Sequence, residues 1–259
     1  MLTSPKNPRI QQIRKLQSNA RARRDNGLFV VEGVRLVEEA QSAGWKPEVL
    51  LYTEDLGERG RQTVDRYTAL GVESLAVLPH VMQVASDTQT PQGILAVMPL
   101  PQAEVPPHPD FLLIADGVRD PGNLGTLLRT ALAAGVQAVI LPPGGVDAFS
   151  PKVVRAGMGA HFRLPILSMD WKTLGSALAG LNLFLADAAG ERSLFEARFE
   201  APLALIIGGE AWGAGDQAAE MASQRVHIPM PGGAESLNAA VAGAILMFEV
   251  VRQRQQSKL

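Results

Sequence analysis

The sequence contains no cysteine among its 259 residues, and it has few aromatic residues and only four histidines. Without cysteine there can be no disulfide and no thiolate metal site. The histidines are isolated from one another, so none has metal-ligand spacing, and we expect no metal. No apolar run approaches the ~20 residues that would cross a bilayer, so we expect no membrane contact. The net charge of −2 does not mark the whole chain as a binder of polyanions.

Hydrophobic residues make up 46% of the chain, which is enough for a sizeable core. The first residues are polar and basic and lack the apolar centre of a signal peptide, so we expect a cytoplasmic protein. Short apolar runs alternate with segments of helical periodicity along the whole length. This alternation predicts an α/β fold.

A proline-rich stretch divides the chain. Five prolines lie between Pro99 and Asp110, and proline sustains neither a helix nor a central strand. We predict a first α/β domain over 1–98, an extended linker over 99–110 and a second domain over 111–259. A long surface loop inside one domain is the alternative. The first domain is predicted to begin with a helix over Asn7–Ala22 that Gly27 terminates.

The second domain is predicted to hold a mostly parallel sheet covered by helices on both faces, because its strands are continuous apolar runs. Two of these strands are Leu203–Gly208 and Val226–Ile228. Predicted helices cover Leu124–Ala134 and Ser236–Val251. Ligands of such sheets bind at the carboxyl ends of the strands, where this sequence has glycine-rich loops.

Basic residues cluster near the N-terminus. Between Met1 and Arg35 the only acidic residues are Asp25 and Glu32. A solvated helix face would explain the cluster, and so would a surface that contacts RNA phosphates. We take the second as the working interpretation. The candidate RNA-binding residues are Lys6, Arg9, Arg14, Lys15, Arg21, Arg23, Arg24 and Arg35.

The first stretch that suggests chemistry is DGVRDPGNLGTLLR, residues 116–129. Pro121 and Gly122 predict a turn, and Asn123 can cap the helix that follows. Arg129 projects from the first half of that helix. A plain cap for Asn123 and a surface ion pair for Arg129 are the alternatives to a ligand-binding role. An arginine in a cleft can bind phosphate or bias a hydroxyl toward ionisation.

Two further loops follow apolar strands. GGEAWGAG, residues 208–215, has one charged side chain, Glu210, which is either an exposed turn carboxylate or a group that orients a neighbour. MPGGAESLN, residues 230–238, precedes the last helix. Ser236 is a candidate helix cap there, whereas Asn238 is predicted to lie past the cap.

Rival motifs are absent or weak. The sequence has no GxxxxGK[ST] and no GxSxG. Residues 213–218, GAGDQA, match G-x-G-x-x-A, but they begin several residues beyond the predicted strand end. A nucleotide-dependent oxidoreductase is therefore disfavoured.

Three stretches resemble the motifs of the SpoU (TrmH-like) family of RNA ribose 2′-O-methyltransferases in the SPOUT superfamily. They are GNLGTLLRTA (122–131), IIGGEAWGAG (206–215) and IPMPGGAESLNAAVA (228–242). In the same way, FVVEG (29–33) and TPQG (90–93) resemble the small ribosomal-protein-like RNA-binding domain of many members. Two departures from the family pattern are Ala211–Trp212 in the second motif and Ala239–Ala240 in the third.

The resemblance implies a deep trefoil knot near the C-terminus, a homodimer, and S-adenosylmethionine as cofactor. It implies ribosomal or transfer RNA as substrate. A catalytically inactive RNA-binding protein with the same fold is the alternative. The implied catalytic residues are Arg129, Asn123, Glu210, Ser236 and Asn238. The implied cofactor-binding residues are Gly208, Gly209, Glu210, Ile228, Met230, Ser236, Leu237 and Asn238.

Overall fold

The computed structural model describes residues 1–210 and 213–256. Its contacts divide the chain into two compact units, one of Met1–Gln102 with Phe149–Phe162 and one of Ala103–Ala148 with Arg163–Leu259. Residues 149–162 therefore group with the first unit, although they fall within the range expected for the second domain. The departures Ala211 and Trp212 lie outside the described residues.

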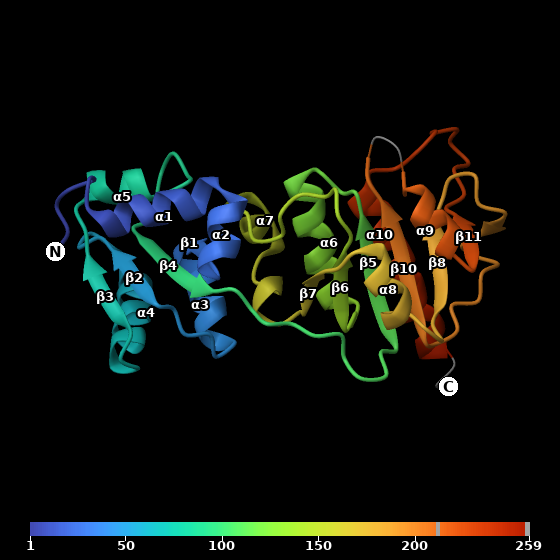
Figure 1. Cartoon of the computed structure of the whole chain (residues 1–259), viewed down its shortest axis with the longest axis horizontal. Coiled ribbons are helices and arrows are strands. Elements are labelled where there is room, and N and C mark those ends of the chain that lie inside the picture. Colours follow the sequence, from blue (N-terminus) through green and yellow to red (C-terminus); the bar gives the residue numbers. More distant parts are fainter. Residues whose placement is uncertain (211–212, 257–259) are drawn as a thin grey trace. The chain divides into compact units, whose positions relative to one another are not determined.

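The first unit is a four-stranded sheet with helices on both faces (Figure 1). The strand order is β1-β4-β2-β3, in which β4 runs antiparallel to both neighbours and β2 pairs with β3 in parallel. The strands are β1 (Leu28–Glu32), β2 (Val49–Tyr52), β3 (Glu73–Ala76) and β4 (Ile94–Pro99). The helices are α1 (Pro8–Ser18), α2 (Ala20–Asn26), α3 (Val34–Ser42), α4 (Glu58–Ala69), α5 (Pro79–Ala85) and α7 (Pro151–Gly157), followed by the 3₁₀ turn η1 (Ala160–Phe162).

Alternate residues of β1 supply two separate cores, because successive side chains of a strand point to opposite faces. Leu28 and Val30 pack with α1 and α5, whereas Phe29 and Val31 pack with α3, α4 and α7. All five residues of β1 are buried. Because both faces of β1 are covered, its sequence is a nearly continuous apolar run.

The N-terminal helix differs from the prediction. Instead of one helix over Asn7–Ala22, the chain forms α1 and α2, separated by Asn19 in an extended conformation. The Asn19 side chain accepts a hydrogen bond from the Ala22 amide at 3.1 Å, so it caps a second helix instead of continuing the first. Gly27, at a φ of 66°, ends α2 as expected.

The second unit confirms the predicted α/β fold with a parallel sheet. Its seven strands lie in the order β7-β6-β5-β10-β8-β11-β9, and every pairing between them is parallel. The strands are β5 (Phe111–Asp116), β6 (Ala138–Leu141), β7 (Ile166–Ser168), β8 (Asn182–Ala186), β9 (Arg192–Ser193), β10 (Leu203–Gly208) and β11 (Gln224–His227). The helices are α6 (Pro121–Ala133), α8 (Trp171–Ala177), α9 (Asp216–Met221) and α10 (Ala239–Gln256).

Helices α8 and α9 pack on one face of this sheet, and α6 and α10 pack on the other. Helix α10 contacts α6 closely at Gly243, where a Cβ would lie 2.4 Å from Leu127 Cδ2 and would force that side chain to move. Strands β5 and β10 are the central pair, and nearly all of their residues are buried. Within the described residues, no helix is long and apolar enough to span a membrane.

Candidate active site

The two central strands bring two loops to one edge of the sheet. Strands β5 and β10 are in register up to Asp116 and Gly208, so the chain leaves both strands side by side. A Cβ on Gly209 would lie 2.2 Å from the Gly117 carbonyl oxygen, and a Cβ on Gly208 would lie 2.2 Å from the Ala214 amide nitrogen. Glycine is needed at 208 and 209 because other segments of this protein pack against them.

Asn123 joins three loops. Its side-chain amide donates to Glu210 Oε1 at 2.7 Å, and its Oδ1 accepts a hydrogen bond from Asn238 Nδ2 at 2.8 Å. Asn123 lies in α6, Glu210 follows β10, and Asn238 ends the loop that follows β11. Because these side chains come from positions 123, 210 and 238, their contacts fix how the three loops sit together.

Two capping expectations were wrong. Helix α6 begins at Pro121 rather than near Leu124, and Asp120 caps it by accepting from the Asn123 backbone amide at 2.8 Å. The Asn123 side chain is thus free to contact the other loops. Helix α10 begins at Ala239 rather than Ser236, and Asn238 Oδ1 accepts from the Ala240 amide at 2.9 Å. Asn238 therefore does cap its helix, and its amide nitrogen still reaches Asn123.

Glu210 is held as a carboxylate. Burial alone would raise its pKa, but hydrogen bonds from the Asn123 side chain and from the backbone amides of residues 210, 119 and 120 outweigh burial and lower the pKa. The Arg119 amide lies 3.4 Å from Glu210 Oε2. An ionised carboxylate whose oxygens already accept hydrogen bonds is a poor base and a good orienting group.

Arg129 lies further along α6 than expected. Because α6 starts at Pro121, Arg129 falls in its second half, about 9 Å along the helix axis from Asn123. Its side chain is exposed, and the structure gives it no ion pair within the described part of the chain. The surface ion pair that was its alternative explanation is not formed there.

The third loop, residues 228–238, is largely accessible. Ser236 and Asn238 are exposed, Leu237 keeps 36% of its surface exposed, and Ile228 and Met230 are half-buried. This loop makes its own turn, in which the Gly233 amide donates to the Met230 carbonyl at 2.9 Å. The loop thus offers apolar side chains and backbone groups together at the edge of the site.

Sequence reasoning missed Asp116. This residue is 6% exposed at the end of β5, and its Oδ2 accepts from the Gly215 amide at 2.7 Å. It ties the loop after β10 to the strand beside it. An acidic residue that closes an apolar strand was the available signal, because such a side chain needs donors when buried. Gly215 lies in the weak dinucleotide-like pattern, so that glycine serves this loop contact.

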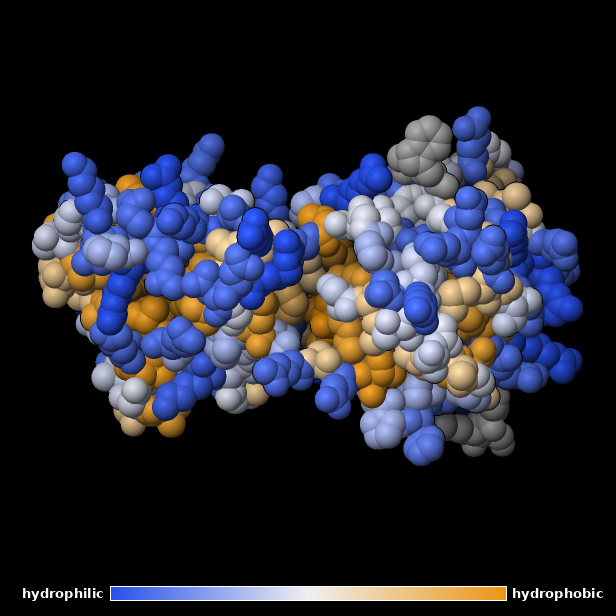
Figure 2. Space-filling model, in the orientation of Figure 1, coloured by the Kyte–Doolittle hydropathy of each residue, from blue (hydrophilic) through white to orange (hydrophobic). Residues whose placement is uncertain are grey.

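The basic residues of the first unit fall into two groups. Arg23 is 4% exposed and donates to the Gln17 carbonyl at 3.2 Å, so it supports the junction of α1 and α2. Arg9 pairs with Glu73 at 2.6 Å, and Arg21 pairs with Asp25 at 3.3 Å. Hydrophilic residues dominate the surface over α1 and α2 (Figure 2). Of the eight candidate RNA-binding residues, those that are exposed and have no ion pair in the described structure are Lys6, Arg14, Lys15, Arg24 and Arg35.

The described residues of the site offer no set of side chains that could bind a metal ion. Among the described residues no group of three His, Asp or Glu side chains could hold a metal ion. The chemical groups at the site are instead amides, a hydroxyl, a carboxylate and a nearby guanidinium. Such groups orient and polarise substrates through hydrogen bonds.

Comparison with known proteins matches both parts of the chain. The SpoU rRNA Methylase family model matches residues 110–248, and the MRM3-like substrate binding domain model matches residues 7–96. A 23S rRNA (guanosine(2553)-2′-O)-methyltransferase of Bacillus subtilis is 33% identical over 252 residues, which cover 96% of this chain and 98% of the relative.

Solved structures agree with these matches. The S-adenosylmethionine-bound rRNA methyltransferase of Sinorhizobium meliloti superimposes with a TM-score of 0.86 at 31% identity, covering 97% of each chain. The SpoU methyltransferase AviRb of Streptomyces viridochromogenes, also in complex with that cofactor, superimposes with a TM-score of 0.88 at 30% identity. This alignment covers 96% of the present chain and 99% of AviRb.

Proposed function

The chain belongs to the SpoU rRNA methylase family, and we propose on that premise that it methylates a ribose 2′-hydroxyl of ribosomal RNA. It is an RNA 2′-O-methyltransferase that uses S-adenosylmethionine. The sequence resemblance also allowed transfer RNA as the substrate. Ribosomal RNA is favoured because the B. subtilis relative acts on 23S rRNA and residues 7–96 match a substrate-binding domain.

One observation at the site carries the proposal. Asn123 links Glu210 and Asn238 by hydrogen bonds of 2.7 and 2.8 Å, which joins the three motif loops at one edge of the sheet. A transferase must hold a donor and an acceptor in one orientation, and effective molarity rises steeply when it does. The three linked loops supply a framework of that kind.

The loops fit the cofactor chemically. Ile228, Met230 and Leu237 offer apolar surface to an adenine, and the backbone at Gly208 and Gly209 approaches the same edge. Ser236 and Asn238 offer a hydroxyl and an amide. When bound, S-adenosylmethionine supplies a methyl group on a positive sulfur, which needs no metal for activation. We assign the cofactor to Gly208, Gly209, Glu210, Ile228, Met230, Ser236, Leu237 and Asn238.

Arg129 is assigned to the substrate hydroxyl. A ribose 2′-hydroxyl is a poor nucleophile at neutral pH and must lose its proton in an aligned position. A guanidinium beside it, and beside the neighbouring phosphate, favours the ionised form. Arg129 has no carboxylate partner among the described residues that would compete for it. Glu210, Asn123, Asn238 and Ser236 orient the loops and the reactants around it.

An apolar stripe supports a homodimer. Val241, Ile245 and Phe248 lie on one face of α10 and keep 47%, 37% and 49% of their surface exposed. Leu237, just before the helix, extends the stripe. Apolar faces of this kind are typically covered by a partner. We propose a second copy of this chain as that partner, in line with the family resemblance.

The remaining assignments follow the same reasoning. We propose that residues 1–98 bind the RNA, that 99–110 link the domains, and that 111–259 carry the transferase with a C-terminal trefoil knot. What supports the knot is the similarity to SpoU structures over nearly the whole chain. Lys6, Arg14, Lys15, Arg24 and Arg35, the exposed candidates without an ion pair in the described structure, are assigned to RNA phosphates. An RNA substrate is consistent with a cytoplasmic location.

The inactive RNA-binding protein finds no support. A protein that had lost its activity could have lost its motif residues as well. The sequence nevertheless retains all five of them, Asn123, Arg129, Glu210, Ser236 and Asn238. We therefore retain the enzyme as the single proposal.

The activity is tested with Arg129→Ala. We expect the variant to lose methyl transfer to unmodified 23S rRNA while its Kd for S-adenosylmethionine, measured by calorimetry, stays within about twofold of wild type. Lys152→Ala, which changes an exposed cation of another helix, is the control and should transfer normally. Full transfer by Arg129→Ala would contradict the role of this residue, and a wild-type protein that does not bind the cofactor would contradict the function.

A further inference from the structure

A cleft of about 360 Å³ opens in the first unit, between the loop before β4 and helix α5. We propose that it binds one unpaired nucleobase of the substrate RNA, an assignment that rests on the proposed function. Its volume is at the lower end of the ~300–1,000 Å³ typical of small-ligand sites. The lining residues are Thr53, Asp55, Pro79, Met82, Gln83, Gln89, Thr90, Pro91, Gln92 and Gly93.

The chemistry of the lining disfavours a phosphate. None of the ten lining residues is Lys or Arg, and one of them, Asp55, is acidic. Phosphate contacts are made chiefly by cations, whereas bases are read by hydrogen bonds from neutral amides and hydroxyls. The three glutamines and two threonines of this cleft are groups of the second kind. Single-stranded RNA is recognised in this way, through bases that are splayed out of the helix.

Two glutamines are held so that they present opposite groups. Gln83 donates its amide to the Gln89 carbonyl at 3.0 Å, which leaves its own Oε1 as an acceptor. The Gln92 Oε1 accepts from the Val34 amide at 3.1 Å, which leaves its NH2 as a donor. The side chains of Gln89 and Thr90 are exposed and make no hydrogen bond within the described structure. The edge of a base likewise carries both donors and acceptors.

A buried carboxylate holds the loop that forms one wall of the cleft. Glu32, at the end of β1, is 8% exposed and accepts hydrogen bonds from the hydroxyls of Ser86 and Thr88. It also accepts from the Asp87 amide at 3.2 Å. A buried carboxylate is costly unless it is fully hydrogen-bonded, so release of this loop would be unfavourable. The loop is therefore ordered before the RNA arrives, which lowers the entropic cost of binding.

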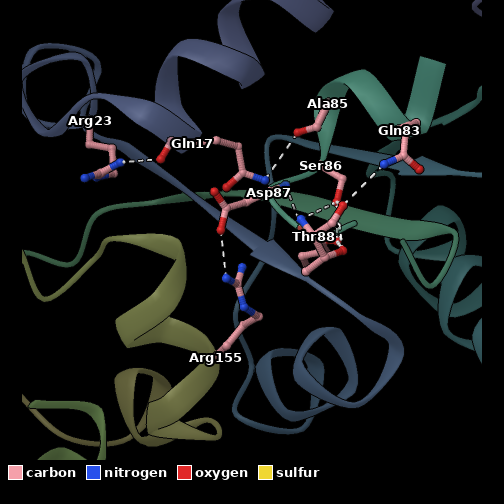
Figure 3. A network of polar contacts seen from close by, with 9 residues as sticks. Gln17, Arg23, Gln83, Ala85, Ser86, Asp87, Thr88 and Arg155 are labelled. Carbon is pink, nitrogen blue, oxygen red and sulfur yellow. Dashed lines mark hydrogen bonds and ion pairs between the residues drawn. The ribbon is translucent and has the colours of Figure 1, made fainter. Parts of the chain in front are cut away.

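An ion pair holds the same loop from its other side. Asp87 Oδ2 lies 2.7 Å from Arg155 Nη2 of α7, a helix that belongs to this unit. Figure 3 shows Asp87 turned toward Arg155, while Gln83 reaches Thr88 across the loop. The ion pair neutralises a carboxylate that would otherwise repel RNA beside the cleft. Both contacts serve to present Gln89 and Thr90 to a ligand.

The proposal is tested by the salt dependence of RNA binding. The variant combines Gln89→Ala with Thr90→Ala, two exposed changes that remove no side-chain hydrogen bond of the described fold. Its affinity for in vitro-transcribed, unmodified 23S rRNA is measured by filter binding at several salt concentrations. Gln62→Ala, an exposed glutamine of α4 outside the cleft, is the matched control.

We expect the double variant to bind at least about fivefold more weakly, because a base contact is lost. The slope of log K against log salt should stay unchanged, because no phosphate contact is lost. Affinity equal to that of the Gln62→Ala control would overturn the proposal. A slope that becomes shallower by about one unit would also overturn it, because that result would identify a phosphate site.

A methylation assay separates this proposal from the function on which it rests. The double variant should raise the KM for the RNA and leave the Kd for S-adenosylmethionine unchanged. If wild type transfers methyl groups and the variant keeps the wild-type KM, the cleft proposal alone is refuted. If wild type transfers no methyl group to this RNA, the proposed function is refuted and the cleft proposal falls with it.

Discussion

Replacing Asn123 with alanine should uncouple the loops of the active site and leave helix α6 intact. The capping bond to Asp120 uses the backbone amide of residue 123, which alanine retains. Only the side-chain bonds to Glu210 and Asn238 disappear. The perturbation is therefore confined to the relation between the three motif loops.

The magnitude follows from the two bonds that are lost. A hydrogen bond to a charged group contributes ~1.5–3 kcal/mol in net terms, and one between neutral groups contributes ~0.5–1.5 kcal/mol. Glu210 and Asn238 are exposed, so water replaces part of each bond and the lower values apply. Their sum is ~2 kcal/mol, which corresponds to a roughly 30-fold loss of kcat/KM if the whole loss falls on the transition state.

The assay is a double-mutant cycle on methyl transfer, built from Asn123→Ala and Glu210→Ala. Because the two side chains contact each other, Glu210→Ala should cost much less in the Asn123→Ala background than in wild type. Asn182→Ala is the matched control, since Asn182 is an exposed asparagine whose side chain makes one hydrogen bond in the described structure, to the Glu200 carbonyl at 3.1 Å. Effects that add to within ~0.5 kcal/mol would refute the coupling, as would an Asn123→Ala enzyme of normal activity.

Two further predictions concern charge. Arg24→Ala should weaken RNA binding and make its salt dependence shallower, while the melting temperature stays unchanged. Arg23→Ala should instead lower the melting temperature, because Arg23 is buried against backbone carbonyls. Equal effects of the two variants on RNA binding and on melting temperature would contradict this division. The pKa of Glu210 is lowered in the folded state, so its stabilising contribution is present above the unfolded value of about 4.5 and is lost as pH falls through the folded pKa. Glu210→Gln should therefore be less stable than wild type at neutral pH, and the difference should shrink below about pH 4.5. Thermal unfolding measured across this range would contradict the assignment if the difference stayed constant.

The sequence predicted most of the fold because its strands are apolar runs of unusual regularity. Strand Leu203–Gly208 has the bounds that were predicted, whereas the strand predicted at Val226–Ile228 is observed at Gln224–His227. It did not predict the break at Asn19, because asparagine is also tolerated inside helices and helical periodicity continues through it. The short strand β9 was missed because two residues carry no periodic signal.

The sequence selected residues that the structure brings together, but it did not predict their contacts. Asn123, Glu210 and Asn238 were selected from the sequence, and the structure brings them into contact. Their capping roles were misassigned because several cap-forming residues lie close together, and only the backbone geometry shows which of them starts the helix. Which unit residues 149–162 pack with depends on long-range contacts, which local patterns do not encode.

The function proposed for this protein is the transfer of a methyl group to a ribose 2′-hydroxyl of ribosomal RNA. The most direct measurement is incubation of the protein with S-adenosylmethionine labelled in its methyl group and with total RNA from cells that lack its gene, followed by digestion to nucleosides. We predict label in a single 2′-O-methylated nucleoside, within RNA of ribosomal size. Label on a base, or label confined to transfer RNA, would contradict the account.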